Sequence, residues 1–490
     1  MVDSTTKNNA VNGKFFKNIT IVLFSNIVSL VSGILIGFII PKIMGLTEYG
    51  YYKTFTLYSS YIGLLHFGFV DGIYLKFAGK SYEELNKPSF RFYSRFLFLM
   101  EAIISLAVVA ASSFFIGSSH FLIVLFLGLN ILATNVVTYY EFIGQITMQF
   151  KKTTLRNIIR CSLNIVSVVG LYLLYRFNQN VIYNYVYAIV TVSINYLLAI
   201  WYVFSYRDIT FGASSSFDDE KDNLVFFFKV GIPLLLSNIV AQLIFVVDQQ
   251  FVNLAFSVDE YSLYAFAYNM ISLITTLTSA ISIVLYPTLK AINEESITRN
   301  YSKLNSYFLM IVAFCLVIYY PLILVVNRFL PQYIGSLQTF LIIVPGVMIS
   351  SSISVIKYNC YKTFNKVNNY FIKSIFVLAL AIIADLVVYY LFKDTKAISI
   401  VSIIVLLIWY ILVELFFVRN YQAKWVKNFL FVILVLGGFY GLSFVPNAFL
   451  GLGFYLLFYF ALIICLYFRE IKDIIMKLKE RKRAKEAVNK

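Results

Sequence analysis

The residues of this sequence that could do chemistry are charged and amide side chains set in or beside long apolar runs. Asp248 is the clearest, because it follows Leu243-Ile244-Phe245-Val246-Val247 and precedes Gln249 and Gln250. A carboxylate is costly in such surroundings, so Asp248 is a candidate for binding a coupling proton or cation, or for holding a cationic group. The alternative is a side chain that reaches the outer membrane surface from near a helix end.

Five lysines could supply positive charge to a central cavity, where an ammonium group is a good point-charge partner for phosphate. They are Lys17, Lys53, Lys76, Lys229 and Lys357. The alternative for each is a lysine that simply follows the positive-inside rule of membrane proteins. Glu141 and Glu414 lie near the cytoplasmic ends of their apolar runs, and we expect them to be hydrated.

Asp71, Asn26 and Asn238 complete the candidates for a substrate cavity. Asp71 lies in Gly68-Phe69-Val70-Asp71-Gly72, where it suits a gate or a contact between lobes, or else a helix-terminal charge at the membrane interface. Asn26 and Asn238 each lie about ten residues into a long apolar run. An amide there most often bonds to a neighbouring helix, and otherwise lines the cavity.

The sequence carries no recognisable catalytic, metal or cofactor site. Its four cysteines are scattered, its two histidines lie far apart, and no Gly-rich phosphate loop or paired acidic motif appears. The formal net charge of +16 could suggest nucleic acid, but the basic residues lie in short loops between apolar runs. We therefore predict a protein that is not an enzyme, with no cofactor, no metal and no nucleic-acid partner.

Membrane-spanning helices must position these residues. The chain is 60% hydrophobic and only 13% charged, and a helix needs roughly 20 apolar residues to cross a bilayer. Backbone groups find no water in the hydrocarbon, which leaves helices as the spanning element. We predict an all-α polytopic membrane protein with about fourteen spans, near 16–40, 50–72, 93–116, 120–147, 157–175, 181–205, 227–252, 261–288, 304–327, 335–358, 371–392, 397–418, 428–446 and 449–468.

A stretch near the start of the chain returns 212 residues later without a gap. Phe15–Tyr52 matches Phe227–Tyr264, and within it Ser25-Asn26-Ile27-Val28 recurs as Ser237-Asn238-Ile239-Val240. A repeat of this length in a membrane chain indicates a transporter built from two related halves. Six spans separate the copies, so the halves share one orientation. We predict two six-helix lobes related by a parallel pseudo-two-fold axis, followed by two extra helices.

Composition shifts divide the chain into six predicted parts. They are a cytoplasmic N-terminus (1–15), an N-lobe (16–205), a cytoplasmic linker (206–226), a C-lobe (227–418), two further helices (419–468) and a basic amphipathic cytoplasmic tail (469–490). Only six of the 40 basic residues fall in connections that we place outside. This asymmetry predicts that both termini lie in the cytoplasm.

The motifs of the two lobes are Gly45-Leu46-Thr47-Glu48-Tyr49-Gly50, Gly68-Phe69-Val70-Asp71-Gly72, Gly231-Ile232-Pro233, Asp248 and Tyr261-Ser262-Leu263-Tyr264. In their order and spacing they resemble the Wzx-like oligosaccharide flippases, a polysaccharide-transporter branch of the multidrug/oligosaccharidyl-lipid/polysaccharide flippase superfamily. The resemblance covers essentially the whole chain. Gln249 departs from it, because the family often has a basic residue after the aspartate.

The resemblance implies alternating access and movement of an undecaprenyl-pyrophosphate-linked oligosaccharide from the inner to the outer leaflet of a bacterial plasma membrane. The product would be a capsule, O-antigen or exopolysaccharide. The implied partners are this lipid-linked oligosaccharide, membrane lipids, a polysaccharide polymerase and a chain-length regulator. Three alternatives remain: a cation-coupled drug or metabolite antiporter of the same superfamily, a membrane-embedded polysaccharide polymerase or glycosyltransferase, and a non-transporting scaffold. The short outer loops disfavour the enzyme.

Overall fold

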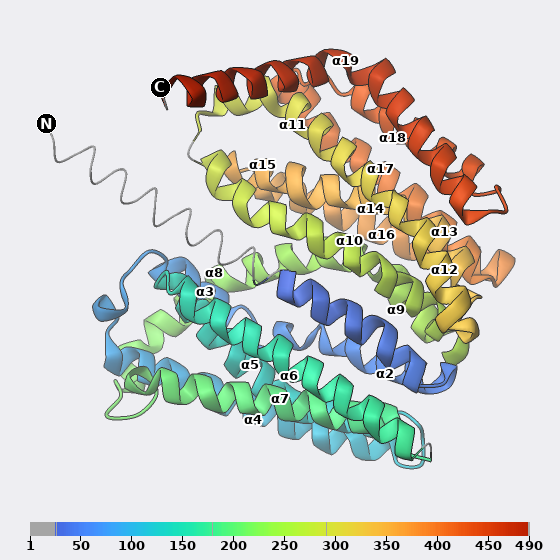
Figure 1. The fold of residues 1–490 in the computed structure, drawn as a ribbon. Coiled ribbons are helices and arrows are strands. Elements are labelled where there is room, and N and C mark those ends of the chain that lie inside the picture. Colours follow the sequence, from blue (N-terminus) through green and yellow to red (C-terminus); the bar gives the residue numbers. More distant parts are fainter. Residues whose placement is uncertain (1–24, 26, 179, 291, 489–490) are drawn as a thin grey trace, which may run out of the picture. The chain divides into compact units, whose positions relative to one another are not determined.

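The computed structural model describes residues 25, 27–178, 180–290 and 292–488 (Figure 1). Within that part of the chain every regular element is a helix, which confirms the predicted all-α fold class. Nine of the described helices are long and apolar enough to cross a membrane, and the bent pair Ser336–Ile343 and Gly346–Thr363 makes a tenth. The chain is therefore a multi-pass membrane protein.

Four further predicted spans coincide with helices outside this set. The first corresponds, within the described residues, to the helix Ile27–Ile43. The second is broken into α2 (Leu46–Ser59) and α3 (Phe69–Phe77), with a short turn of 3₁₀ helix between them. The eighth is α10 (Val258–Lys290), and the thirteenth is the shorter helix α18 (Val426–Leu442).

The chain forms two compact units, residues 1–269 and 270–490, and the division falls inside α10. Besides the helices named above, unit 1 contains α4 (Lys87–Ala111), α5 (Phe121–Ile146), α6 (Phe150–Phe177), α7 (Tyr183–Ser205), α8 (Phe217–Ile244) and α9 (Val247–Ala255).

Buried tyrosines hold the helices of unit 1 together. In Figure 1, α5 lies beside both α4 and α7. The rings of Tyr140 on α5 and Tyr202 on α7 stack with their centres 6.1 Å apart, and Tyr93 on α4 is buried in the same core. Helices in a bilayer gain little from burying apolar surface against each other, so close ring packing of this kind supplies much of the association energy.

Glycines allow α3 and α8 to cross with their backbones in contact. A Cβ atom on Gly231 would lie 1.8 Å from the carbonyl oxygen of Gly68, and one on Gly72 would lie 2.2 Å from the carbonyl oxygen of Phe227. Gly68 also has a φ of +77°, a conformation that glycine adopts without strain. The motif Gly68-Phe69-Val70-Asp71-Gly72 therefore forms a close crossing of α3 and α8.

The segment predicted as a linker is partly helical. Its first residues form a 3₁₀ turn, Arg207–Ile209, and α8 begins at Phe217, ahead of the apolar run that marked the predicted span. Ser216 and Asp219 cap this helix reciprocally, since each side chain bonds to the backbone N–H of the other. Three acidic residues in the first turn also complement the positive helix end.

Unit 2 contains the rest of α10 and nine further α-helices. They are α11 (Glu294–Cys315), α12 (Tyr319–Phe329), α13 (Ser336–Ile343), α14 (Gly346–Ser351), α15 (Tyr358–Thr363), α16 (Val367–Phe392), α17 (Thr395–Tyr421), α18 and α19 (Ala448–Val488). A π-helical turn, Ser352–Lys357, joins α14 to α15. The backbone of α19 breaks at Tyr467, with φ −120° and ψ 20°, just before the basic tail.

Candidate functional site

Lys53 is a half-buried ammonium group framed by aromatic rings in unit 1. It lies on α2, with Nζ 5.4 Å from the ring centre of Tyr49 and 5.7 Å from that of Tyr52. Nζ donates to Oδ1 of Asn269 at 3.3 Å, and Nδ2 of Asn269 donates in turn to the carbonyl oxygen of Gly37. Within the described part of the chain no carboxylate lies within ion-pair distance of this ammonium. Lys53 is therefore a candidate for contact with an anionic ligand.

Asp248 lies in the first turn of α9, and its side chain is only 3% exposed. The break between α8 and α9 turns the chain at this point, with Val246 in a non-helical conformation. The carboxylate accepts hydrogen bonds from the hydroxyl of Tyr264 at 2.8 Å and from that of Tyr268, both on α10. Its burial is at odds with the alternative in which Asp248 reaches the membrane surface.

Polar contacts join α2 to the α9–α10 segment around these two residues. Gln250 donates to the hydroxyl of Tyr58, and Nδ2 of Asn253 donates to Oγ1 of Thr54 at 2.7 Å. Thr47 donates to Asp259, which lies 212 positions later. This separation equals the repeat length, and contacts between equivalent positions are expected near a two-fold axis. The parallel arrangement of the lobes itself stays a prediction.

Asp71 and Lys76 lie on α3, and their described polar partners differ from those of Asp248. Asp71 is buried, with Oδ2 3.8 Å from Nδ1 of His66, which accepts a hydrogen bond from the backbone of Gly68. Lys76 is exposed and donates to the side chain of Asn223 near the start of α8. Both residues thus belong to the α3–α8 crossing.

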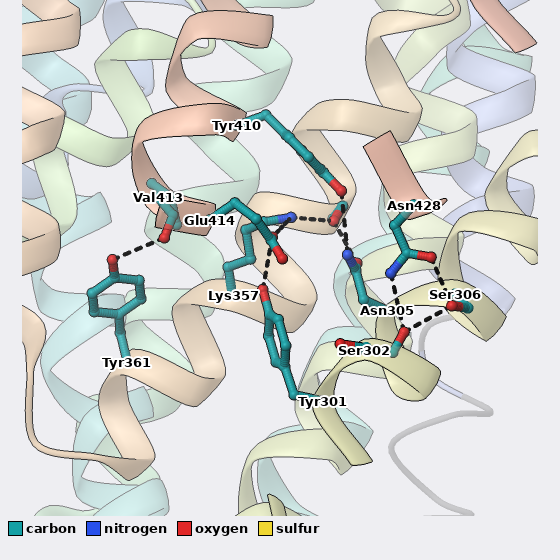
Figure 2. A network of polar contacts seen from close by, with 11 residues as sticks. Tyr301, Ser302, Asn305, Ser306, Lys357, Tyr361, Tyr410, Val413, Glu414 and Asn428 are labelled. Carbon is teal, nitrogen blue, oxygen red and sulfur yellow. Dashed lines mark hydrogen bonds and ion pairs between the residues drawn. The ribbon is translucent and has the colours of Figure 1, made fainter. Parts of the chain in front are cut away.

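Lys357 is fully buried in unit 2 and is neutralised there. Figure 2 shows its ammonium group beside the carboxylate of Glu414. Nζ lies 3.1 Å from Oε2 of Glu414, which is on α17. The side-chain exposures are 0% and 1%, so our expectation that Glu414 is hydrated is wrong. The carboxylate of Glu414 is instead buried in the helix bundle, because the ammonium of Lys357 neutralises it there.

Two helices and the π-helical turn supply the remaining partners of this ion pair (Figure 2). Tyr301 on α11 donates to Oε2 of Glu414 at 2.9 Å, and Lys357 donates to Oγ of Ser352 at 2.9 Å. The ring centre of Tyr410 lies 3.5 Å from the ammonium nitrogen. A π-helical turn commonly marks a functional position in a helix, and here it carries Lys357 at its end.

The other predicted site residues are less informative. Lys229 is exposed on α8, and Asn238 lies in the same helix, with only its backbone described. Lys17 and Asn26 lie outside the described residues. Within the described part of the chain no group of three or more His, Cys, Asp and Glu side chains is placed to hold a metal ion.

Sequence reasoning missed the tyrosines that hold Asp248. Tyr264 and Tyr268 are four residues apart on α10, so they lie on one helix face. Their i, i+4 spacing was available in the sequence. Their pairing with Asp248 was not, because it depends on how α9 and α10 pack.

Comparisons with known proteins bear on the fold. No family model and no curated protein matches the sequence. Among solved structures, the lipid II flippase MurJ in an inward closed conformation is similar over 93% of this chain and 100% of that chain, with a TM-score of 0.63 and 16% identity. An inward-facing multidrug resistance MATE family transporter of the MOP superfamily is similar over 81% and 94%, with a TM-score of 0.61 and 14% identity. At these identities the likeness is one of fold, and this chain has the all-helical fold that these two transporters share.

Proposed function

We propose that this protein is a flippase. It moves an undecaprenyl-pyrophosphate-linked oligosaccharide from the inner to the outer leaflet of a bacterial plasma membrane, by alternating access, for surface polysaccharide synthesis. Both termini would face the cytoplasm, and a polymerase and a chain-length regulator would act with it. The fold shared with a lipid II flippase supports a lipid-linked substrate.

The observation that carries this proposal is the Lys53 site. Two tyrosine rings attract the ammonium without neutralising it, because a ring quadrupole carries no net charge. The amide of Asn269 adds a second polar group beside it. A phosphate oxygen could replace the amide as the acceptor for Nζ and gain a charge-assisted hydrogen bond. Lys357 offers no such site, because the carboxylate of Glu414 already neutralises its charge.

The direction of transport also agrees with an anionic substrate. An anion that moves outward across an inside-negative membrane gains roughly 2.3 kcal/mol per charge for every 100 mV. Removal of the product by polymerisation would favour the same direction.

We predict that Lys53→Met lowers export of surface polysaccharide at least tenfold, while Lys53→Arg retains a substantial part of it. Methionine keeps the apolar stem but removes the charge, whereas arginine keeps the charge in a different geometry. The measurement is surface polysaccharide in a flippase-deficient strain complemented with each variant, at matched protein level. Lys80→Met is the control, because Lys80 is exposed in the same unit. Normal export by Lys53→Met would contradict the proposal.

A second candidate function is a cation-coupled drug or metabolite antiporter, and the buried Asp248 favours it. The two functions share a prediction: Asp248→Asn impairs transport while expression and membrane insertion stay normal. Asparagine keeps the size of the side chain but cannot take up or release a proton. Binding of a proton could then no longer shift the equilibrium between the two conformations. Asp208→Asn, at a half-exposed position, is the control.

Two measurements separate the two functions. Failure of the wild type to restore polysaccharide export, together with cation-driven drug efflux that Asp248→Asn abolishes, would favour the antiporter. Full export by Asp248→Asn would show that this carboxylate is dispensable, leaving membrane potential and polymerisation as the driving forces. A polymerase or glycosyltransferase is less well supported, because the two structures compared above are named as a flippase and a transporter.

A further inference from the structure

Unit 1 contains a cavity of about 390 Å³ between α2, α5, α6 and α7. It lies within one unit, and its described lining residues include neither Lys53 nor Asp248. Most of its lining side chains are hydroxyls and amides. Inside a membrane bundle such side chains hydrogen-bond across helices or to whatever fills the cavity.

Some of the lining groups satisfy one another. Nδ2 of Asn195 on α7 donates to Oδ1 of Asn130 on α5 at 2.9 Å. Nη2 of Arg160 on α6 donates to Oε1 of Glu141 on α5 at 2.9 Å, and these two side chains are about one-third exposed. The predicted hydration of Glu141 agrees with this exposure.

Other lining groups have no hydrogen-bond partner among the described residues. The hydroxyls of Ser59 and Thr134 and the Nε of Arg160 are buried and have no hydrogen-bond partner within the described part of the chain. Burial of a polar atom without a hydrogen-bond partner is costly, because the atom gives up its bonds to water and gains none in return. The three residues that carry these atoms come from three different helices and border one cavity, so rotation of their side chains would bring these groups to a polar occupant of the cavity.

The charge of the lining restricts what that occupant can be. Among the described residues of the lining, Glu141 and Arg160 are the ionisable ones, and they form a pair. A cation near the carboxylate of Glu141 would be repelled by the guanidinium of Arg160 beside it. An anion near that guanidinium would be repelled by the carboxylate. A neutral ligand avoids both conflicts. Its polar groups must donate and accept, because the serine, threonine and asparagine side chains around it do both.

A sugar ring has this chemistry. Its hydroxyls donate and accept, and its C–H face is apolar, which suits Phe55 and Val137 in the same lining. We propose that this cavity is a subsite for a neutral sugar residue of the transported oligosaccharide. The proposal rests on the proposed flippase function and adds to it the class of ligand that unit 1 recognises. Arg160 and Ser59 would serve as donors to ring or hydroxyl oxygens, and Asn195 and Asn130 would set specificity.

The test uses the purified full-length protein in lipid nanodiscs. Saturation-transfer difference NMR measures binding of three neutral probes, the methyl glycosides of glucose, galactose and N-acetylglucosamine. We expect at least one to bind saturably. The double variant Ser59→Ala/Thr134→Val should weaken that binding at least fivefold, because it removes the two unpartnered hydroxyls while keeping the side chains nearly isosteric.

Ser167→Ala is the matched control. Its hydroxyl bonds within its own helix to the carbonyl oxygen of Leu163, and it does not line the cavity. Farnesyl pyrophosphate, an anionic probe, checks that each sample is folded and tests the phosphate site separately. The double variant should bind it as well as the wild type does.

Two results would overturn the subsite. The first is that no glycoside binds while the same sample binds farnesyl pyrophosphate; this result would indicate a cavity that holds water only and would leave the flippase proposal intact. The second is glycoside binding that the double variant does not weaken. Failure of farnesyl pyrophosphate to bind the wild type would instead count against the proposed function.

Discussion

Replacing Glu414 by glutamine will destabilise the protein by about 3–5 kcal/mol, the largest effect that we expect from a conservative change. The substitution keeps the size of the side chain but leaves the ammonium of Lys357 buried without its counter-charge. The cost of breaking a buried ion pair comes mainly from the charge that remains. Equilibrium unfolding in mixed detergent micelles measures the loss.

The double variant Lys357→Met/Glu414→Gln distinguishes this explanation from simple loss of packing. It removes the orphaned charge, so it should recover most of the stability lost by the single variant. Lys87→Ala is the control for a solvent-exposed pair. Lys87 and Asp208 are nearly half exposed at 3.5 Å, and breaking such a pair should cost less than about 1 kcal/mol. A double variant as unstable as Glu414→Gln alone would contradict our account.

We also expect the ion pair to fix the helices of unit 2 in one arrangement. Lys357, Glu414 and Tyr301 come from the π-helical turn, α17 and α11, so the network ties three segments that are distant in the sequence. Limited proteolysis of the Glu414→Gln variant should therefore cut more rapidly within residues 270–490 than within the rest of the chain.

Gly231→Ala will destabilise the protein by about 3 kcal/mol, the second largest effect that we expect. The new Cβ would lie 1.8 Å from the carbonyl oxygen of Gly68, closer than any real contact, so the backbones of α3 and α8 must move apart. Overpacking against side chains typically costs 1–3 kcal/mol, and a clash with rigid backbone belongs at the upper end. The same unfolding experiment measures this change.

Gly170→Ala is the matched control for Gly231→Ala. Gly170 lies within α6, and a Cβ there would meet nothing within 4 Å. Alanine also has a higher helix propensity than glycine, so this variant should be neutral or slightly stabilising. If Gly231→Ala and Gly170→Ala are equally stable, then the α3–α8 contact does not constrain the fold in the way that the structure indicates.

The sequence by itself determined the helices and the membrane class. Hydropathy acts over about twenty consecutive residues, and a helix satisfies its backbone locally, so both can be predicted from a single stretch of chain. The early start of α8 was also available there, because Ser216 and Asp219 have the spacing of a capping box. The predicted span began only at residue 227, because hydropathy marks the apolar run and not the polar turn before it.

Only the tertiary structure decided which polar groups meet. Asp248 was identified as costly to bury, but its tyrosine partners depend on the packing of α9 against α10. Lys357 was expected to offer its charge to a substrate, and instead Glu414 neutralises it. A side chain's cost of burial is a local property that the sequence records. Its partner lies on another helix, and the packing of helices that are far apart in the chain selects that partner.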